Sequence, residues 1–527
     1  MKTIMMRTLR VLAAAVVLFF IVPINVSAAE ISQLSIKANG DGTVSIVDCQ
    51  TSAEGELVIP EKIGGRTVTT IAGEAFSQCR NITKVTLPGT ITSIGSGAFW
   101  DCVNLEEINF PDSITTIGNE AFDNCISLKA VQLPDSVTTL GWEVFSGCTN
   151  LSSANIPKQL EKVPDEIFSH CENLRSIVIP SNIQSIGFRS FWKSGLVSIT
   201  IPSSVKTLES FCFTDCEDLA FITLNEGLQS IGTDAFRNCT SLKLAVIPDS
   251  VEHLADGGFA RCTSLETLVI GKGIKSFADY LGHFRGCSNL RKVILFSECS
   301  RIGHESFENC PAITDVYYGG TEQEWLNLSV GTKNDSILLA NVHYIKSFKD
   351  VKTASWYGYP VYWAVAKEVT SGMGEGTFRP MAPLSRAQAV TFLYNLAGKP
   401  DVSALQTKEF ADVPSTAWYN DAIKWAVANK ITSGYGTGTF QPNTTCTRAM
   451  IVTFLANYAK AAGIHREPTI SSTFTDVAEN AWYKASVDWA VENGITSGYG
   501  AGTFSPNVTC NRAMMVTFLK KVDALTA

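Results

Sequence analysis

Hydrophobic positions recur along residues 58–318 with a period of about 23 residues. Each unit contains a short run of alternating apolar and polar residues that closes on a proline; these are Pro60, Pro88, Pro111, Pro134, Pro157, Pro180, Pro202 and Pro248. A phenylalanine follows the same period: Phe76, Phe99, Phe122, Phe145, Phe168, Phe191, Phe213, Phe236, Phe259, Phe284 and Phe307. Such a period is typical of solenoids, whose units bury their apolar faces against one another. We therefore predict a solenoid of about eleven turns.

Within one unit, the alternation assigns each side chain to a face of a strand. In the unit that begins at Leu105, we expect Leu105, Ile108 and Phe110 to point inward, and Glu107 and Asn109 outward. The proline closes the strand because it has no N–H to donate. A second extended piece and a short helical turn should follow in each unit. Residues 30–57 are expected to form an N-terminal cap, with a hairpin turn at residues 39–42.

The outward strand positions change character along the array. They are polar in the early turns and apolar in the later ones, where they are Phe221, Leu244, Val246, Val269, Ile294 and Tyr317. An exposed apolar stripe commonly marks a binding site for a partner. Two alternatives stay open: such residues simply favour strands, or the C-terminal tail folds over them.

Ten of the 15 cysteines fall at one position of the repeat. Their Cβ vectors should run parallel along the stack, which disfavours disulfides, and no paired CxxC spacing indicates a metal site. We interpret them as a buried ladder of small side chains.

After residue 344 a longer period begins. Phe348–Val351 recurs as Phe410–Val413 and Phe474–Val477, and a Trp-Tyr pair follows each of them. Apolar spacing predicts helix, glycine turn and helix in each copy. We define module 1 as residues 348–400, module 2 as 410–463 and module 3 as 474–525. Ser385, Thr447 and Asn511 are the expected N-caps of the second helices.

The first 29 residues have a basic start, an apolar stretch and a small-residue cleavage site, which predict a secretion signal. No later segment is expected to span a membrane once the signal is removed. The net charge of −8 argues against a nucleic-acid partner. Neither the glycine loops nor the six histidines match a nucleotide, metal or nucleophile motif, so we expect no catalytic residue, no cofactor and no metal.

The repeat, roughly I-P-x-S-V-T-x-I-G-x-x-A-F-x-x-C-x-x-L-x-x-I-x-I-P, resembles the BspA-like leucine-rich repeat of bacterial surface proteins over about residues 40–344. The resemblance implies a leucine-rich repeat solenoid, mostly β with short helical turns, over residues 58–344. The segment from Tyr317 to Tyr344 is similar to the one that closes such arrays.

The three modules resemble S-layer homology (SLH) modules in their FxDV motif, Trp-Tyr pair, glycine loop and capped Arg-Ala. The resemblance implies an all-α pseudo-threefold unit that binds anionic secondary cell-wall polysaccharide in the grooves between its modules. Carried over, the site residues are Arg386, Arg448 and Arg512, with Gly372, Gly434 and Gly498 at the loop starts. The family's glutamate after Arg-Ala is replaced by Gln388, Met450 and Met514.

Together these features predict a secreted, non-catalytic protein on a Gram-positive-type cell wall. Its modules would bind the wall, and its solenoid would bind a protein or host-surface ligand whose identity is unknown. The alternatives are a structural component of the surface layer and an SLH-anchored enzyme.

Overall fold

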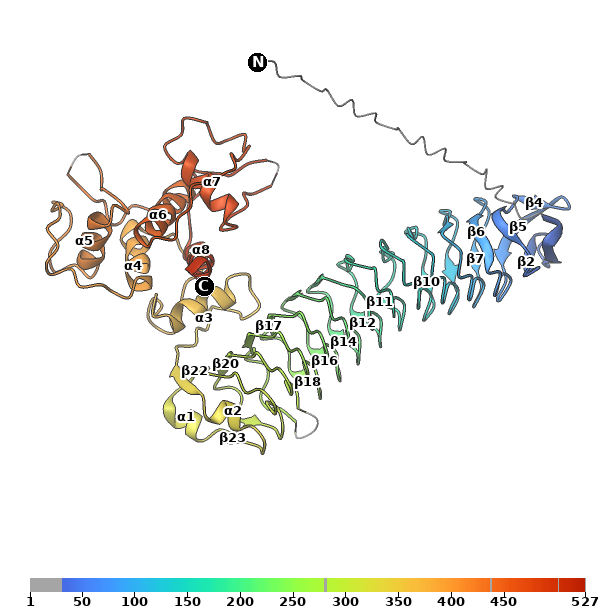
Figure 1. Ribbon diagram of the computed structural model, residues 1–527, viewed down its shortest axis with the longest axis horizontal. Coiled ribbons are helices and arrows are strands. Elements are labelled where there is room, and N and C mark those ends of the chain that lie inside the picture. The colour runs from blue at the N-terminus through green and yellow to red at the C-terminus, as the bar shows by residue number, and fades with distance from the viewer. Residues whose placement is uncertain (1–30, 279–281, 437, 501, 527) are drawn as a thin grey trace, which may run out of the picture.

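The computed structural model describes residues 31–278, 282–436, 438–500 and 502–526 (Figure 1). A long stack of turns leads into a group of helices at its C-terminal end. The expected secretion signal, residues 1–29, lies outside the described residues. None of the helices in the described ranges is long and apolar enough to cross a membrane.

The solenoid consists of short strands joined by turns. Its elements are η1 (Ile31–Gln33), β1 (Leu34–Ala38), β2 (Val44–Cys49), β3 (Glu54–Val58), β4 (Lys62–Ile63), β5 (Arg66–Ile71), β6 (Asn81–Thr86), β7 (Ser93–Ile94), β8 (Glu107–Ile108), β9 (Thr116–Ile117), β10 (Thr139–Leu140), β11 (Lys162–Val163), β12 (Ser185–Ile186), β13 (Ser198–Ile201), β14 (Thr207–Leu208), β15 (Phe221–Leu224), β16 (Ser230–Ile231), β17 (Leu244–Val246), β18 (His253–Leu254), β19 (Thr267–Val269), β20 (Lys292–Phe296), β21 (Arg301–Ile302), β22 (Asp315–Gly319), α1 (Glu322–Leu326), β23 (Ser329–Val330), α2 (Asp335–Leu338) and β24 (Asn341–Tyr344).

The C-terminal modules contain the remaining helices. These are α3 (Gly358–Ala366) and α4 (Arg386–Leu396) in module 1, α5 (Asn420–Ala428) and α6 (Arg448–Ala461) in module 2, and α7 (Lys484–Glu492), α8 (Arg512–Asp523) and η2 (Ala524–Thr526) in module 3. Each module is helix, loop and helix, as its apolar spacing predicts.

Two parallel ladders run along the solenoid. We call ladder A the strands at the repeat position that precedes the proline where a unit has one: β3, β6, β8, β13, β15, β17, β19, β20, β22 and β24. On the other ladder, strands such as β7 and β9 pair one repeat apart, with Ser93 opposite Thr116. The hairpin of β1 and β2 is antiparallel and closes the N-terminal end.

The interior is organised by the phenylalanine of each unit. From Phe76 to Phe307 successive rings stack with centroids 4.9 to 6.0 Å apart. The segment that carries each ring forms consecutive turns, with residues such as Glu120 and Asn124 in the left-handed region at φ 54° and 60°. Each unit therefore buries its ring only against the units before and after it.

The cysteines are all buried and free. Nine thiols of the ladder, from Cys102 to Cys310, each donate to the carbonyl of the phenylalanine one repeat earlier, at 3.0 to 3.3 Å. Burial raises the pKa of thiols such as Cys171 well above the usual value. A protonated, hydrogen-bonded thiol is a poor nucleophile.

We expect these thiols to be inert in the native protein. Ellman's reagent should label none of the 15 at a measurable rate in buffer and all of them in guanidinium chloride. A Val178→Cys variant provides the control, because that side chain is 82% exposed and should label at once. Rapid labelling of several native cysteines in the unsubstituted chain would contradict the ladder.

His283 makes the solenoid sensitive to acid. Its side chain is fully buried beside Phe277, and its Nδ1 lies 3.4 Å from Ser306 Oγ. Burial lowers the pKa of His283 from 6.5 to about 4, because it penalises the charged imidazolium. The unfolded chain therefore binds the proton more tightly than the folded chain does.

The expected result is a loss of stability on acidification. As pH falls from about 6.5 to about 4, the free energy of unfolding should drop by up to about 3 kcal/mol from this group, with no further loss from it below that range. Urea unfolding at pH 7 and pH 4, compared with a His283→Gln variant, measures the difference. A variant that loses as much stability as the wild type would refute the assignment.

Module 1 packs against the end of ladder A, where α3 lies above β20 and β22 (Figure 1). Val269 and Ile294 belong to the same buried cluster as Phe348 and Tyr362 of module 1, and Val246 and Tyr317 pack against its edge. An exposed apolar stripe is therefore wrong for Val269 and Ile294, which are 0% and 3% exposed, and the alternative that the C-terminal part of the chain covers them is confirmed there. Leu244, Val246 and Tyr317 are partly buried, and Phe221 alone of the six is well exposed, at 69%.

Polar contacts fix the segment that leads into α3, residues 345–354, which we call the strap. Asp249 accepts hydrogen bonds from the Thr353 N–H at 3.1 Å and its hydroxyl at 2.5 Å. Glu226 accepts one from the Ala354 N–H at 3.3 Å. Lys272 Nζ donates to the Phe348 carbonyl at 2.7 Å. The solenoid and module 1 thus share an apolar interface with hydrogen bonds along its edge.

Candidate functional site

The three modules meet around a ring of backbone hydrogen bonds. Leu384 N–H donates to the Cys510 carbonyl, Cys510 N–H to Cys446, and Cys446 N–H to Leu384, at 2.8 to 2.9 Å. These three side chains are fully buried. Because each residue occupies the same position in its own module, the ring gives the unit its pseudo-threefold arrangement.

One arginine from each module crosses to the next module. Arg386 Nε donates to the Phe440 carbonyl at 3.0 Å, Arg448 Nε to Phe504 at 3.1 Å, and Arg512 Nε to Phe378 at 2.8 Å. Two of them make a second bond: Arg386 Nη2 to Thr432 Oγ1 at 3.4 Å, and Arg448 Nη2 to Thr496 Oγ1 at 2.9 Å. The three junctions are therefore closed by the same contact.

Aromatic rings enclose each guanidinium. Arg386 lies 4.7 Å from the ring centroids of Tyr435 and Phe440, and Arg448 lies 4.7 and 4.6 Å from those of Tyr499 and Phe504. Arg512 lies 4.5 Å from Phe378. Such cation–π contacts favour a planar, weakly hydrated cation.

The arginines are less accessible than the sequence suggested. They are only 2–4% exposed, so they do not project into solvent to meet a polymer directly. The expected direct contact is replaced by a structural one, because the side chain folds back across the module junction. All three lie at the junctions between modules, and polysaccharide binding at these junctions stays a prediction.

The guanidinium charges are buried without a carboxylate partner. None of the ion pairs among the described residues of the three modules includes these arginines. Burial lowers the pKa of Arg386 and Arg448, and that of Arg512 to about 10. All three stay charged at neutral pH. The nearest negative charge that acts on each is the FxDV aspartate at its junction, which makes no ion pair with the arginine.

The junction between modules 3 and 1 differs from the other two. Arg512 Nη2 has no hydrogen-bond partner among the described residues. The loop residue that corresponds to Tyr435 and Tyr499 is Met373 in module 1. Among the described residues, this junction therefore has no hydrogen bond from the guanidinium to a threonine hydroxyl and no loop tyrosine, although Arg512 keeps its contact with the Phe378 ring.

The loops at the junctions are held by the aspartate of each FxDV motif, which the sequence reasoning did not single out. Asp350 accepts from the N–H groups of Phe378 and Arg379, at 2.8 and 2.7 Å. Asp412 and Asp476 make the same pair of bonds in modules 2 and 3, at 2.7 to 2.8 Å. Recurrence of this aspartate at one place in every module was the signal that could have identified it.

The three loop-start glycines have a backbone role. Gly372, Gly434 and Gly498 have φ of +90°, +73° and +85°, and a Cβ on any of them would clash with the FxDV phenylalanine of its module. The loops thus require glycine for conformation and close packing.

The N-caps of the second helices form as expected. Ser385 and Gln388 make a complete capping box, whereas Thr447 and Asn511 each accept from the N–H of a methionine with no return bond. Gln388 therefore replaces the family's glutamate without loss of the cap, while Met450 and Met514 keep half of it.

The accessible side chains at the junctions are those that cover the arginines. Tyr499 is 51% exposed while its ring stacks on Arg448, and Tyr435, on Arg386, is partly exposed. Met373 is 41% exposed. Sequence reasoning missed these residues because it assigned the loops to their glycines alone.

Two family descriptions match this chain, one over the solenoid and one over the C-terminal modules. The family description "BspA type Leucine rich repeat region" matches in six copies, over residues 59–173, 92–220 and 206–325, about half of the chain. The description "S-layer homology domain" matches residues 347–390, 409–449 and 473–514.

Relatives share only part of the chain. A cellulosome-anchoring protein of Acetivibrio thermocellus is 28% identical over 152 residues, which are 28% of this chain and 34% of that protein. A surface-layer 125 kDa protein of Lysinibacillus sphaericus is 29% identical over 163 residues, 30% of this chain and 13% of that protein. The matches thus span about a third or less of these relatives' own length.

Among solved structures, a leucine-rich cell surface protein of Faecalibacterium prausnitzii is 25% identical, with a TM-score of 0.38. The match covers 57% of this chain and 97% of that structure. The repeats and the three C-terminal domains account for most of the described residues, and both are non-catalytic, surface-anchoring types. The chain belongs to the BspA-type leucine-rich repeat family and carries three S-layer homology domains, the domain combination of a bacterial cell-surface protein.

Proposed function

We propose that the chain is a non-catalytic surface protein whose SLH domains bind the anionic secondary polysaccharide of a Gram-positive-type cell wall. The solenoid is then presented outward as a binding surface for another protein. One observation supports the anchoring half: at each of the three junctions a buried guanidinium that makes no ion pair among the described residues lies beneath accessible loop side chains. Such a field attracts an anionic polymer.

In this proposal the arginines attract the polymer through their electric field from beneath the groove and do not touch it. A guanidinium that is screened by protein instead of water keeps more of its field at the surface above it. The loops, with their aspartate-bound N–H groups and left-handed residues, provide the groove walls. Tyr435 and Tyr499 are the side chains we expect a sugar unit to touch.

Sedimentation with purified cell walls tests the anchor. The full chain should pellet with intact walls and stay in the supernatant once the secondary polymer has been stripped. A Tyr435→Glu/Tyr499→Glu double variant places a carboxylate above two of the guanidiniums and should reduce pelleting at least tenfold, because it neutralises the attraction. The matched Tyr435→Phe/Tyr499→Phe variant keeps the rings and should pellet like the wild type.

Two results would refute the proposal. One is pelleting that persists on stripped walls, which would place the binding on peptidoglycan or protein. The other is equal binding by the glutamate and phenylalanine variants, which would remove the junctions from the site. Thermal melts of both variants confirm that the modules stay folded.

A further inference from the structure

The strand pairing of ladder A is interrupted in the middle of the solenoid. Near both ends, the apolar residue before each proline donates its N–H to the outward residue of the next turn. Examples are Ile59 to the Thr86 carbonyl and Ile247 to Val269, both at 2.9 Å. Between β8 and β13 the ladder contains one isolated bridge, Ala130 to Ser153, and no named strand.

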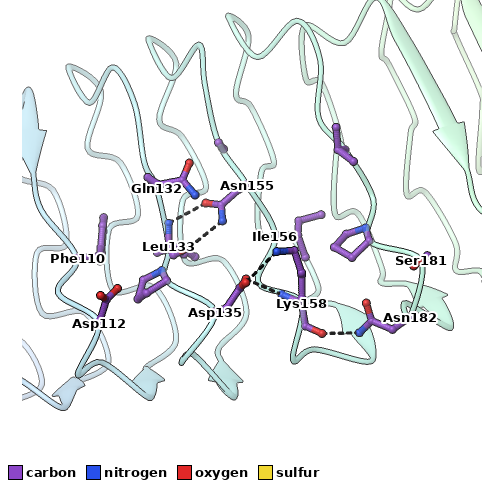
Figure 2. A pocket seen from close by; sticks show the side chains of 14 residues that line it. Phe110, Asp112, Gln132, Leu133, Asp135, Asn155, Ile156, Lys158, Ser181 and Asn182 are labelled. Atoms are coloured by element: carbon purple, nitrogen blue, oxygen red, sulfur yellow. Dashed lines mark hydrogen bonds and ion pairs between the residues drawn. The ribbon is translucent and has the colours of Figure 1, made fainter. Parts of the chain in front are cut away.

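An asparagine side chain takes the place of the backbone bond at two turns, one within this region and one just before it. Asn155 Oδ1 accepts from the Leu133 N–H at 2.7 Å, and its Nδ2 donates to the Leu133 carbonyl at 2.8 Å (Figure 2). Asn109 makes the same pair of bonds to Leu87, at 2.6 and 2.9 Å. One carboxamide thus satisfies both backbone groups of one residue.

The next turn lacks this arrangement. Val178 stands where the pattern would place the asparagine, and it is 82% exposed. Among the described residues, neither the N–H nor the carbonyl of Ile156 forms a hydrogen bond, although the residue as a whole is 4% exposed. Unpaired backbone groups in a mostly buried residue are costly, so this donor–acceptor pair is available to an incoming group.

The open pair lines a cavity of about 640 Å³ on the outer surface of the solenoid. Figure 2 shows Leu133, Asn155 and Ile156 along it, with the Asp135–Lys158 pair at its rim, where Nζ and Oδ2 are 2.9 Å apart. The cavity lies midway along the same ladder that receives module 1 at its C-terminal end. Ladder A therefore already binds polypeptide within this chain.

We infer that this cavity binds a polypeptide partner through an Asn or Gln side chain that pairs with the backbone of Ile156. A primary carboxamide presents a C=O and an N–H on one edge, as Asn155 does to Leu133. A trans secondary amide, such as the N-acetyl group of a sugar, presents them on opposite edges and cannot reach both groups. A whole strand fits between two turns only if they are two strand spacings apart, roughly 9.6 Å. At the neighbouring turn the single side chain of Asn155 already reaches Leu133.

The proposed function presents the solenoid outward as a binding surface. This inference names a polypeptide as its ligand, and it rests on that proposed function. Wall sedimentation does not depend on it, so the two proposals fail separately. Val178→Asn is the decisive substitution, because it installs the missing side chain and fills the site from within. Val58→Asn is the matched control: Val58 is also exposed, at 62%, and also stands before an Ile-Pro pair, but it is not among the residues that line this cavity.

The experiment is selection of a random 12-residue phage-displayed peptide library on the full chain. Selected peptides should share an Asn or Gln, lose at least tenfold in affinity to the Val178→Asn protein and keep it for Val58→Asn. Replacing the shared Asn by Asp in the peptide should cause a similar loss, since a carboxylate cannot donate to the Ile156 carbonyl.

Three results would overturn the inference: no selected peptide, peptides that bind the Val178→Asn protein equally well, or competition by N-acetylglucosamine. Hydrogen exchange provides an independent test of whether the backbone groups of Ile156 are unpaired. The Ile156 amide should exchange much faster than that of Leu133 in the free wild type, and Val178→Asn should slow it. Equal exchange at both positions would show that the Ile156 pair is not open.

Discussion

Arg448→Ala is expected to lower the free energy of unfolding of the SLH unit by roughly 3–4 kcal/mol. The substitution removes the bonds to the Phe504 carbonyl and Thr496 and the cation–π contacts with Tyr499 and Phe504. It also leaves the Phe504 carbonyl without this donor in a closed junction. Relief of the guanidinium's burial offsets part of the loss, so the net cost is smaller than the sum of the contacts.

The matched variant is Arg512→Ala. Because Arg512 Nη2 has no partner among the described residues, this arginine makes one hydrogen bond fewer, and its loss should cost about 1 kcal/mol less than that of Arg448. Calorimetric melting of the full chain separates the SLH transition from that of the solenoid. Equal costs for the two variants, or melting unchanged in both, would mean that the arginines do not hold the junctions together.

Ile294→Asp should release module 1 from the solenoid. The side chain is 3% exposed in the cluster shared with Phe348 and Tyr362, so a carboxylate there would be buried without a counter-ion, at a cost of several kcal/mol. Undocking relieves this cost while both parts stay folded. We expect a larger radius of gyration in small-angle scattering and faster proteolysis within the strap.

Phe221→Asp is the control for this variant. It lies on the same face of ladder A, but it is 69% exposed and outside the docked surface, so scattering and proteolysis should match the wild type. An Ile294→Asp protein with an unchanged radius and an intact strap would show that the apolar contact does not hold module 1.

The repeat could be predicted from sequence because its determinants are local and recur. Each Phe and Cys occupies one position per turn, and the stacked rings and thiol–carbonyl bonds follow from that spacing. The C-terminal helices could be predicted for the same reason, since their caps and apolar faces lie within each module.

Contacts between distant segments could not be predicted in this way. Nothing near Val269 or Ile294 in the sequence indicates that Phe348 and Tyr362 will cover them, because a strand's outward face looks the same whether solvent or another element lies on it. The burial of the three arginines could not be predicted for a related reason. A basic residue at a helix start usually extends into water, and only the position of Phe440 or Phe504, over 50 residues away, turns it inward.

The strap determines how the molecule carries mechanical load. If the far tip of the solenoid is pulled while the SLH unit is fixed to a wall, tension does not pass through residues 345–348 alone. It divides among the bonds that Glu226, Asp249 and Lys272 make to the strap, which lie on three successive turns and are strained together. Bonds loaded in parallel share the force and yield together, so the joint should resist a steady pull and then give way in one step.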